Sequence, residues 1–541
     1  MKICEEQAGF RRHFSTIDHI YTLYSMVNNR LYGNKRGKLY VVFIDYKKAF
    51  DRVNRDILWH ILKEQGVSTK MIKIIKAIYS TVKATVRFGN KFSEMIDCPL
   101  GVKQGCLLSP LLFSILINKV AQKVAERGRS GYQFIPGGKE IFSLLFADDI
   151  VLISQTPSGL QNQINNLKIA SEELGLEINI QKTKSVVFRK GGYLGRAEKW
   201  YYGGEQIETV NSYKYLGYTF TTKLSTEIAL SEFAGRAKGK IISIFKALYK
   251  IGRIDISIFF HLFDAQVKPM ALYAAEVWGN SENEAMNVIE KVHMFAARKL
   301  LGVSIKTPKQ FIYGELNRYP LMIDSKIKTL KYWLKIQLME DSRIPKQAYT
   351  RDENELLIHE NSWSGAIKKM LETNGYGYIW INKGTQMIPS FIRSFKQRLI
   401  DQFWQNWSDK INNKNRFQIY REIKTQHQRE DYLKHITVTK FRKIFTKMRF
   451  GVLDINGNKR YYDENANKKC QLCGYKEENE IHVFLSCPSY AMFRENVYKH
   501  WPNTEELQLK EILNNSNEDK NKDLAMFLFY SMKRREYLLN G

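Results

Sequence analysis

Two adjacent aspartates, Asp148 and Asp149, lie between short apolar runs at residues 144–147 and 150–154. Apolar segments on both sides of a brief polar break are typical of a tight β-hairpin, so the sequence predicts two carboxylates at a hairpin turn. Like charges side by side on a buried hairpin are unfavourable unless something compensates them. Because oxygen ligands suit Mg²⁺, a divalent cation is the natural compensator. A solvated Asp-Asp turn between surface strands is the alternative that these residues alone leave open.

A third carboxylate, Asp45, directly follows a run of β-branched and aromatic residues at positions 39–44. Such a run predicts a buried strand. An acidic residue at the end of a buried strand is well placed for a ligand site, as in other open α/β sheets. Taken by itself, Asp45 is equally consistent with a helix cap or a turn former.

A second group of candidate ligands lies near the other end of the chain. Cys470, Cys473, His482 and Cys487 fall within 18 residues. Thiolates and an imidazole at this spacing suit tetrahedral Zn²⁺, and Gly474 eases the turn after the second cysteine. The alternative is three unrelated cysteines and a surface histidine.

A glycine-containing loop precedes a helix that we expect from about residue 110 to 126. The loop holds Lys103, Gln104 and Gly105. Close backbone approach, hydrogen bonding and positive charge together suit a nucleic-acid backbone or a triphosphate. An ordinary loop with a proline at the helix start is the alternative.

The composition points to a polyanionic partner. The chain has 541 residues, with 84 Lys and Arg against 55 Asp and Glu and a net charge of +29. Nucleic acid is the first candidate and an anionic membrane surface the second. We find no apolar run that approaches the length of a bilayer span and no signal-peptide core, and six cysteines do not suggest a disulfide scaffold. We therefore expect a reducing compartment, either cytosol or nucleus.

The remaining pattern divides the chain into a mixed half and a helical half. Before residue 222 the sequence predicts both helices and strands, with helices over 16–31, 54–64, 71–80 and 159–174 and strands over 84–88, 92–96, 185–188 and around 215–218. From about residue 225 it predicts long helices over 225–250, 254–278, 283–301 and 325–340. Residues 391–450 hold 15 Lys or Arg, 5 Asp or Glu and 11 aromatics. Basic residues interleaved with aromatics suit phosphate contact and base stacking, although periodic aromatics in helices are more often core.

These segments together resemble the palm of a reverse transcriptase from a non-LTR (LINE-type) retrotransposon. Their order and approximate spacing match that family, and the resemblance covers roughly residues 5–490. Five segments carry it, at residues 43–51, 101–110, 146–149, 174–184 and 215–217. The cysteine cluster resembles the C-terminal zinc knuckle of the same elements.

The resemblance implies an α+β fold with a right-hand polymerase palm, partial fingers, a helical thumb and a helical C-terminal region that carries a small zinc knuckle. The implied domains are partial fingers and palm (1–221), thumb (222–345), a basic helical region (346–460) and the zinc-knuckle region (461–541). Family members carry more fingers sequence before residue 5 and an endonuclease domain. We therefore expect an N-terminally truncated part of a longer element protein.

The resemblance also implies roles for the acidic residues and their metals. Asp45 and Asp148 would bridge two catalytic Mg²⁺ ions, with Asp149 in support. One ion would activate the primer 3′ hydroxyl while the other holds the triphosphate and the leaving pyrophosphate. One structural Zn²⁺ would be held by the cysteine cluster.

Four further residues receive substrate-binding roles from the same resemblance. Phe50 resembles the gate that excludes a ribose 2′ hydroxyl. Gln104 and Gly105 would contact template and nucleotide. Lys182 would face the phosphates and protonate the leaving group.

The implied function is that of an RNA-directed DNA polymerase, a nucleotidyltransferase that copies RNA into cDNA. Its partners would be an RNA template, a DNA primer or target and dNTPs, in a ribonucleoprotein of the nucleus and cytoplasm that is neither secreted nor membrane-bound. An inactive nucleic-acid-binding remnant of a decayed element is the main alternative, and a group II intron maturase is a second. A purely structural zinc protein does not explain five ordered palm motifs.

Overall fold

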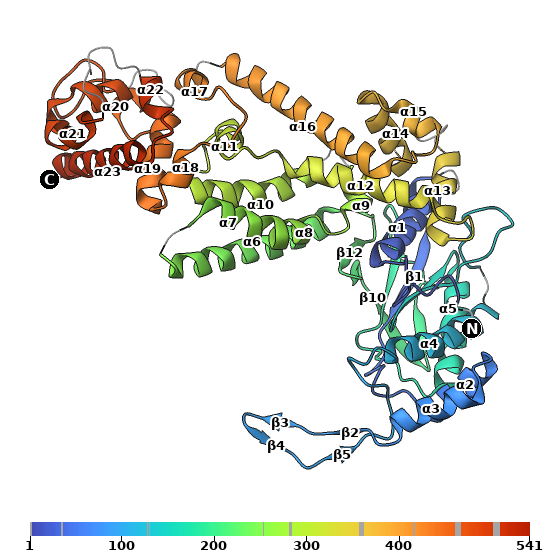
Figure 1. Cartoon of the computed structure of the whole chain (residues 1–541). Coiled ribbons are helices and arrows are strands. Elements are labelled where there is room, and N and C mark those ends of the chain that lie inside the picture. Colours follow the sequence, from blue (N-terminus) through green and yellow to red (C-terminus); the bar gives the residue numbers. More distant parts are fainter. Residues whose placement is uncertain are drawn as a thin grey trace. The chain divides into compact units, whose positions relative to one another are not determined.

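The computed structural model describes most of the chain, namely residues 3–33, 36–126, 128, 130–252, 254–280, 284–355, 362–414, 417–459, 467–500 and 509–540. The residues pack into two compact units (Figure 1). Unit 1 comprises Met1–Ala229, Ala274–Asn280 and Lys328–Gln386. Unit 2 comprises Leu230–Tyr273, Ser281–Ile327 and Met387–Gly541.

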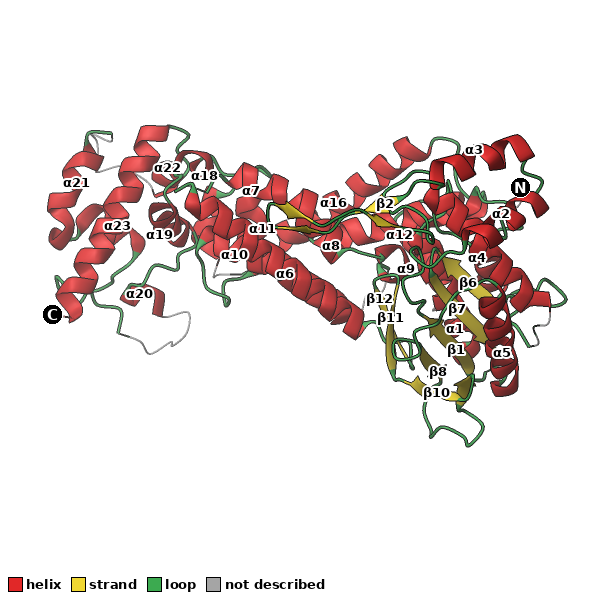
Figure 2. Cartoon of the chain, turned by 90° about the horizontal axis from the view of Figure 1, so that it is seen from below, coloured by secondary structure: helices red, strands yellow, loops and turns green. Residues whose placement is uncertain are grey.

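A six-stranded sheet forms the centre of unit 1 (Figure 2). Its strand order is β6-β7-β1-β8-β10-β9, and β1 pairs antiparallel with both β7 and β8. All six residues of β1 are buried, as its β-branched and aromatic sequence predicts. The strands are β1 (Leu39–Ile44), β6 (Ser143–Phe146), β7 (Asp149–Ser154), β8 (Lys184–Phe188), β9 (Trp200–Tyr202) and β10 (Glu205–Thr209).

The two faces of this sheet pack against different elements, because successive side chains of a strand point to opposite faces. Val42 and Ile44 belong to one core with residues of α4 (Ser109–Glu126) and α5 (Pro157–Glu173), which Figure 2 shows beside the strands. Phe43 instead stacks on Tyr213 of a separate two-stranded sheet. That sheet pairs β11 (Ser212–Tyr215) with β12 (Tyr218–Thr221). The other described helices of unit 1 are α1 (Thr16–Tyr32), α2 (Arg55–Glu64), α3 (Thr69–Tyr79), α9 (Ala275–Trp278), α13 (Ile344–Asn354), α14 (Trp363–Thr373) and α15 (Gly377–Ile381).

A narrow ribbon extends from unit 1 beyond α3 (Figure 1). The expected hairpin strands over 84–88 and 92–96 form two short pairs, with β2 (Lys83–Ala84) against β5 (Ile96–Asp97) and β3 (Arg87–Phe88) against β4 (Lys91–Phe92). Every residue of these four strands is exposed. The ribbon therefore has no hydrophobic face packed against the unit.

The described part of unit 2 is helical, as the sequence predicts. One helix prediction is wrong, because the expected continuous helix over 254–278 is divided into α7 (Ile256–Leu262), a π-helical turn and α8 (Lys268–Ala271) in unit 2, and α9 in unit 1. Pro269 cannot donate a backbone hydrogen bond, and Ala274 has a φ of 54°, which a helix interior excludes. The other helices include α6 (Glu227–Lys250), α10 (Glu284–Leu301), α11 (Lys309–Leu316), α16 (Ile388–Asn412), α17 (Gln418–Ile423), α18 (Tyr432–His435), α19 (Thr439–Arg449), α20 (Asn456–Lys459), α21 (Ala491–Tyr498), α22 (Leu509–Leu513) and α23 (Glu518–Asn540). The α12 helix (Leu321–Gln337) begins in unit 2 and ends in unit 1.

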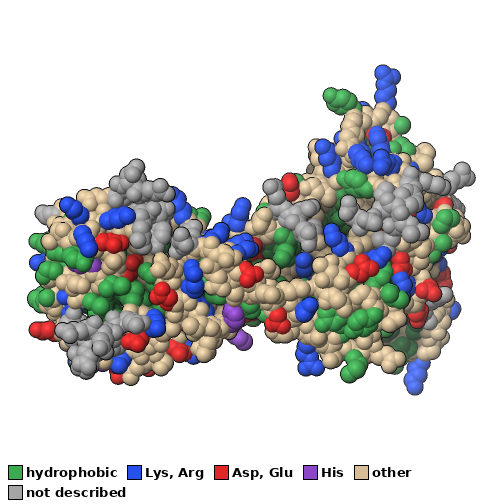
Figure 3. Space-filling model, turned by 90° about the horizontal axis from the view of Figure 1, so that it is seen from above, with side chains coloured by type: hydrophobic (Ala, Val, Ile, Leu, Met, Phe, Trp, Pro, Cys, Tyr) green, Lys and Arg blue, Asp and Glu red, His purple; other side chains and the backbone are tan. Residues whose placement is uncertain are grey.

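The mixed helix-and-sheet class predicted from the sequence is confirmed. The four-part division into functional domains stays a prediction, and its boundary at 460/461 lies outside the described residues. Among the helices that the structure describes, none has the length and apolar character needed to span a bilayer. In the view of Figure 3, Lys and Arg side chains are spread over both units with Asp and Glu among them.

Candidate active site and metal centre

The β6–β7 hairpin places the paired aspartates at one end of the sheet. Phe146 pairs with Asp149, so the two turn residues are Ala147 and Asp148, and Asp149 is the first residue of β7. The sequence predicted a turn formed by Asp148 and Asp149, but the turn lies one position earlier, at Ala147 and Asp148. Ala147 has a φ of 56°, a left-handed conformation that costs energy for any residue except glycine.

Strand pairing brings Asp45 to the same end of the sheet. Ile44 is the register partner of Ile150 in the antiparallel pair of β1 and β7. Asp45 follows Ile44 and Asp149 precedes Ile150, so in this antiparallel pair the two aspartates lie side by side at the same end of the sheet. The structure thus gathers the three predicted carboxylates, although Asp45 is distant from the other two in sequence.

The electrostatics of Asp149 reflect this gathering. Its pKa rises from 3.8 to about 6, first because its surroundings desolvate the carboxylate and then because Asp148 and Asp45 carry like charge. An all-oxygen donor set suits Mg²⁺. In the described part of the chain, the three aspartates do not form a cluster in which the ligand atoms of all members lie within 4.8 Å of one another. A bound cation would neutralise their repulsion and draw them together.

The loop before β8 supports Asp45 from its backbone. The Asp45 N–H donates to the Thr183 hydroxyl over 3.2 Å, and the Asp45 carbonyl accepts from the Asn179 N–H over 2.7 Å. Between these two anchors, the Nζ of Lys182 lies 4.0 Å from an Asp45 carboxylate oxygen and is largely exposed. The structure therefore brings Lys182 beside the carboxylates.

Phe50, Gln104 and Gly105 line one pocket of about 770 Å³ in unit 1. Phe50 stacks on Phe113 of α4 with ring centres 4.4 Å apart, and its carbonyl accepts from the Val102 N–H. Gly101, at the start of the loop, has a φ of 85° and lies so close to the Asp51 backbone that a Cβ would approach its carbonyl oxygen to 2.7 Å. The three predicted aspartates are not among the described residues that line this pocket.

The segment that precedes α1 also supports the hairpin. Residues 6–9 lie along the edge of β6, where Leu145 exchanges backbone hydrogen bonds with Glu6 and Ala8. Gln7 is fully buried, and its Oε1 accepts from the backbone N–H of Gly9 (2.7 Å) and of Ala147 (3.2 Å). No periodicity or spacing in the sequence identifies this role.

A buried histidine also supports the hairpin. His19 of α1 is 4% exposed, lies with Nδ1 3.2 Å from the Tyr215 hydroxyl and packs edge-on against Phe146. Burial lowers the pKa of His19 to about 3, helped by the positive charge of Arg343. The ring is therefore neutral at physiological pH. The only sequence evidence for this role of His19 was its position within the helix predicted over 16–31.

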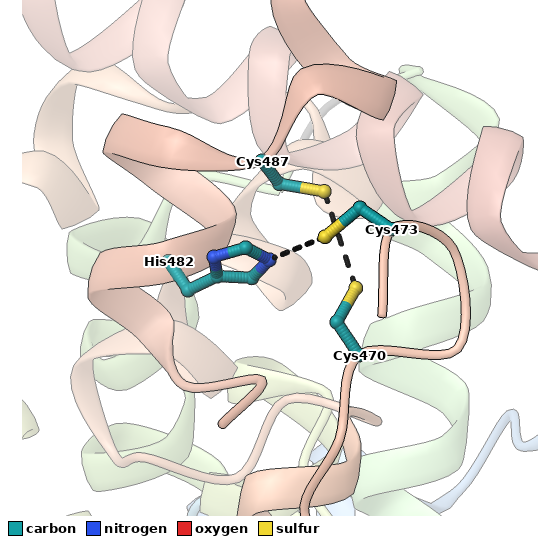
Figure 4. Close-up of side chains that lie close together, drawn as sticks. All are labelled: Cys470, Cys473, His482 and Cys487. Atoms are coloured by element: carbon teal, nitrogen blue, oxygen red, sulfur yellow. Dashed lines mark hydrogen bonds between the residues drawn. The ribbon is translucent and has the colours of Figure 1, made fainter. Parts of the chain in front are cut away.

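The Cys/His cluster converges in unit 2 (Figure 4). The ligand atoms of Cys470, Cys473, His482 and Cys487 all lie within 4.8 Å of one another. Cys473 Sγ is 3.3 Å from His482 Nε2, and the Sγ atoms of Cys470 and Cys487 are 4.0 Å apart. Three sulfurs and one imidazole nitrogen are donors of the kind that bind Zn²⁺, so this cluster is able to hold a metal.

Local backbone geometry assembles the cluster. Gly474, with a φ of 76°, donates its N–H to the Cys470 carbonyl and closes the turn between the first two cysteines. His482 begins a π-helical turn that ends immediately before Cys487, and its ring stacks on Tyr475 at 4.7 Å.

A buried ion pair, which the sequence did not indicate, supports the cluster from α23. Glu478 is fully buried and accepts hydrogen bonds from Arg535 through both oxygens, at 3.0 and 2.8 Å. The same carboxylate lies 3.7 Å from the Cys470 sulfur. The α23 helix is thereby linked to the first ligand.

Comparisons with known proteins identify a matching family model and several relatives. A family model described as "Reverse transcriptase (RNA-dependent DNA polymerase)" matches residues 1–220. The retrovirus-related Pol polyprotein from the type-1 retrotransposable element R2 of Nasonia vitripennis is 31% identical over 154 residues, covering 28% of this chain and 15% of the relative. The corresponding R2 protein of Popillia japonica is 22% identical over 316 residues, covering 55% and 50%. A probable RNA-directed DNA polymerase from transposon BS of Drosophila melanogaster is 24% identical, covering 58% and 34%.

The chain spans half or less of the length of these three relatives. A solved structure of telomerase from Candida albicans, in complex with a fragment of telomeric RNA, covers 67% of this chain and 53% of its own at 14% identity, but its TM-score of 0.30 is too low to inform the fold. Residues 1–220 therefore form a reverse transcriptase domain, and the resemblance of this chain to non-LTR retrotransposon reverse transcriptases is confirmed.

Proposed function

We propose that this chain is an RNA-directed DNA polymerase that copies RNA into cDNA by two-metal nucleotidyl transfer. The observation that carries the proposal is the register of β1 and β7, in which Ile44 opposite Ile150 brings Asp45 and Asp149 to one end of the sheet. The reverse transcriptase domain at residues 1–220 supports the same function. Within this proposal residues 1–221 contain fingers and palm, and 222–345 are the thumb.

Asp45 and Asp148 would hold two Mg²⁺ ions in this scheme, with Asp149 in support. When bound, the ions would supply activation of the primer 3′ hydroxyl and neutralisation of charge on the triphosphate and its leaving group. The chain contributes by fixing its carboxylates at the ends of paired strands and in the turn between β6 and β7, so that little reorganisation accompanies the reaction. The raised pKa of Asp149 supports a cation site, because the accumulated negative charge is relieved by a bound cation.

The remaining site residues bind the substrates. Phe50, Gln104 and Gly105 share one pocket, which supports a common role for them in contacting template and nucleotide, with Phe50 as the gate against a ribose 2′ hydroxyl. Lys182 faces the phosphates and donates a proton to the leaving group. Substituting Phe50 with alanine is expected to leave DNA synthesis in place and to admit ribonucleotides.

The Cys/His cluster holds one structural Zn²⁺ in our proposal and forms a nucleic-acid-binding knuckle. Its donor set and spacing support zinc, and the net charge of +29 supports an RNA template and a DNA primer as partners. Such a protein works in a ribonucleoprotein of the nucleus and cytoplasm.

Primer extension on an RNA template tests the polymerase proposal. Asp148→Asn keeps the shape of the turn residue but removes a ligand charge, so extension is expected to fall by at least about a hundredfold while RNA binding is retained. Asp56→Asn, at an exposed position of α2, is the matched control and should behave like the parent. Equal extension by Asp148→Asn and the parent would refute the scheme. A parent that binds RNA but never extends a primer would favour the inactive remnant.

A further inference from the structure

A second pocket, of about 440 Å³, lies within unit 2 between α11, the first turns of α12 and α16. It belongs to none of the motifs that identify the reverse transcriptase domain. We call it the α11–α16 pocket. It is lined by Lys309, Gln310, Tyr313, Pro320, Met322, Ile323, Lys326, Leu399, Gln402, Phe403, Asn406, Trp407 and Lys410.

Aromatic rings form the floor of the α11–α16 pocket, and their polar atoms already have partners. Trp407 donates its Nε1–H to the Gln310 carbonyl over 2.8 Å, and the Tyr313 hydroxyl donates to Glu290 over 2.7 Å. Phe403 packs edge-on against Tyr313, with ring centres 5.2 Å apart. Because these bonds fix the Trp407 and Tyr313 rings, the floor presents a rigid apolar surface rather than free hydrogen-bonding groups.

Most aromatics of the basic stretch 391–450 are core residues, and Phe403 is an exception. The buried ones are Phe391, Phe395, Trp407, Phe417, Tyr420, Tyr432, Phe445 and Phe450. Phe403 is only half-buried and lines the pocket. The stacking function suggested by this stretch is therefore best sought at this pocket.

The rim of the α11–α16 pocket is cationic. Lys309, Lys326 and Lys410 line it together with the amides of Gln402 and Asn406, and none of the described lining residues carries a carboxylate. An aromatic floor accepts any base by stacking, amides hydrogen-bond to base edges, and lysines attract phosphates. This combination matches a nucleotide that has an unpaired base and flanking phosphates.

We propose that the α11–α16 pocket binds an unpaired nucleotide of a single-stranded nucleic acid. The chain would use it to hold a strand at a position that is not the site of polymerisation. The identification of the strand as template or primer rests on the proposed polymerase function, whereas binding itself does not require that chemistry.

Photocrosslinking of the full chain tests the proposal. A single-stranded RNA oligonucleotide containing 4-thiouridine is irradiated with the protein, and the crosslinked peptides are mapped by mass spectrometry. Crosslinks are expected in the peptides that contain Tyr313 and Phe403. The double variant Lys309→Glu/Lys410→Glu should lose at least about tenfold of this crosslinking, and the log–log salt dependence of its affinity should become shallower by about 1.4.

A charge-matched control separates the pocket from general electrostatics. Arg393 and Arg398 are exposed on α16, the helix that carries Lys410, and are not among the pocket residues, so Arg393→Glu/Arg398→Glu makes the same change in net charge outside the pocket. Phe403→Leu keeps all the lysines and should weaken single-strand binding at least about fivefold through lost stacking. Equal losses in both charge-reversal variants, or unchanged crosslinking in Phe403→Leu, would overturn the proposal.

Two further arms distinguish other outcomes. Abolition of the crosslink by excess dATP would assign the pocket to a free nucleotide and overturn binding of a strand. Repeating the measurements with Asp148→Asn separates this inference from the polymerase proposal. A parent without primer extension, whose crosslink is nevertheless lost in Lys309→Glu/Lys410→Glu, would refute the polymerase and support the pocket.

Discussion

The two candidate metal centres of this chain are built in opposite ways. The carboxylate site of unit 1 takes Asp45 from the end of β1 and Asp148 and Asp149 from a hairpin far along the sequence, and the sheet register brings them together. The Cys/His cluster of unit 2 takes all its ligands from residues 470–487, through one tight turn and one π-helical turn.

This difference indicates which of the two sites requires its metal in order to fold. The strands that carry the carboxylates belong to a large apolar core with α4 and α5, so the sheet is stable without a cation. The cysteine segment is short, and the buried thiols at its centre contribute little apolar packing of their own. Burial raises the pKa of the Cys470 thiol to about 12, so a cation is needed to keep it as a thiolate. Metal should be catalytic in the first site and structural in the second.

Metal removal should therefore have the largest effect on folding stability, and this effect should be confined to unit 2. Chelation, or Cys473→Ser, is expected to unfold residues 468–490 locally, because structural zinc contributes roughly 10–16 kcal/mol in small zinc modules. Hydrogen exchange should show loss of protection in this segment while β1 keeps its protection. Cys106→Ser, outside the cluster, is the control. Absence of stoichiometric zinc in the purified protein, or equal loss of protection in β1, would contradict this comparison.

The ion pair behind the cluster should give the next largest effect. Arg535→Ala leaves the fully buried Glu478 carboxylate without its partner, which is expected to cost about 3–5 kcal/mol. Hydrogen exchange of residues 470–487 measures the loss. Arg534→Ala removes a neighbouring exposed arginine from the same helix and should be nearly neutral. Adding Glu478→Gln to Arg535→Ala should recover part of the stability, and failure to do so would indicate that packing of the Arg535 chain dominates.

The same contrast explains what the sequence could predict. The ligands of the cluster were predictable because they are close in sequence, and β1 was predictable because an unbroken β-branched run is a strong pattern. Gln7 and Arg535 were not, because each acts through a contact with a residue more than 50 positions away, which no local periodicity encodes. The break at 263–275 was missed because the apolar spacing continues through Pro269, and the spacing contains no information on the φ of Ala274.

The next largest effect on stability is expected in unit 1, from the loss of the Gln7 side chain. Gln7→Leu removes the acceptor for the Gly9 and Ala147 N–H groups, at a cost of about 1–3 kcal/mol for each donor left unpaired. Since Ala147 holds the turn in its left-handed conformation, primer extension should fall together with the hydrogen-exchange protection of β6. Gln206→Leu, at an exposed position of β10, is the control. Unchanged extension in Gln7→Leu would show that β6 and β7 fix the turn without this contact.

The smallest expected effect is the pH dependence of His19, which distinguishes the two units again. Its pKa is about 3 in the folded chain and about 6.5 in the unfolded chain, so between these values the unfolded chain binds the additional proton. The stabilisation is complete above about pH 6.5 and is lost as the pH falls, by about 2 kcal/mol at pH 5. His19→Gln should be less stable than the parent at pH 7 but should lose about 2 kcal/mol less between pH 7 and pH 5.

Exchange of the β1 amides is the appropriate measurement, because acid also protonates the Cys/His ligands and would release metal from unit 2. His60→Gln, at an exposed position of α2, should keep the pH dependence of the parent. The His19 interpretation fails if His19→Gln and the parent lose equal stability between pH 7 and pH 5. In that case the acid sensitivity of unit 1 would come from other groups, and His19 would support Phe146 and Tyr215 by packing alone.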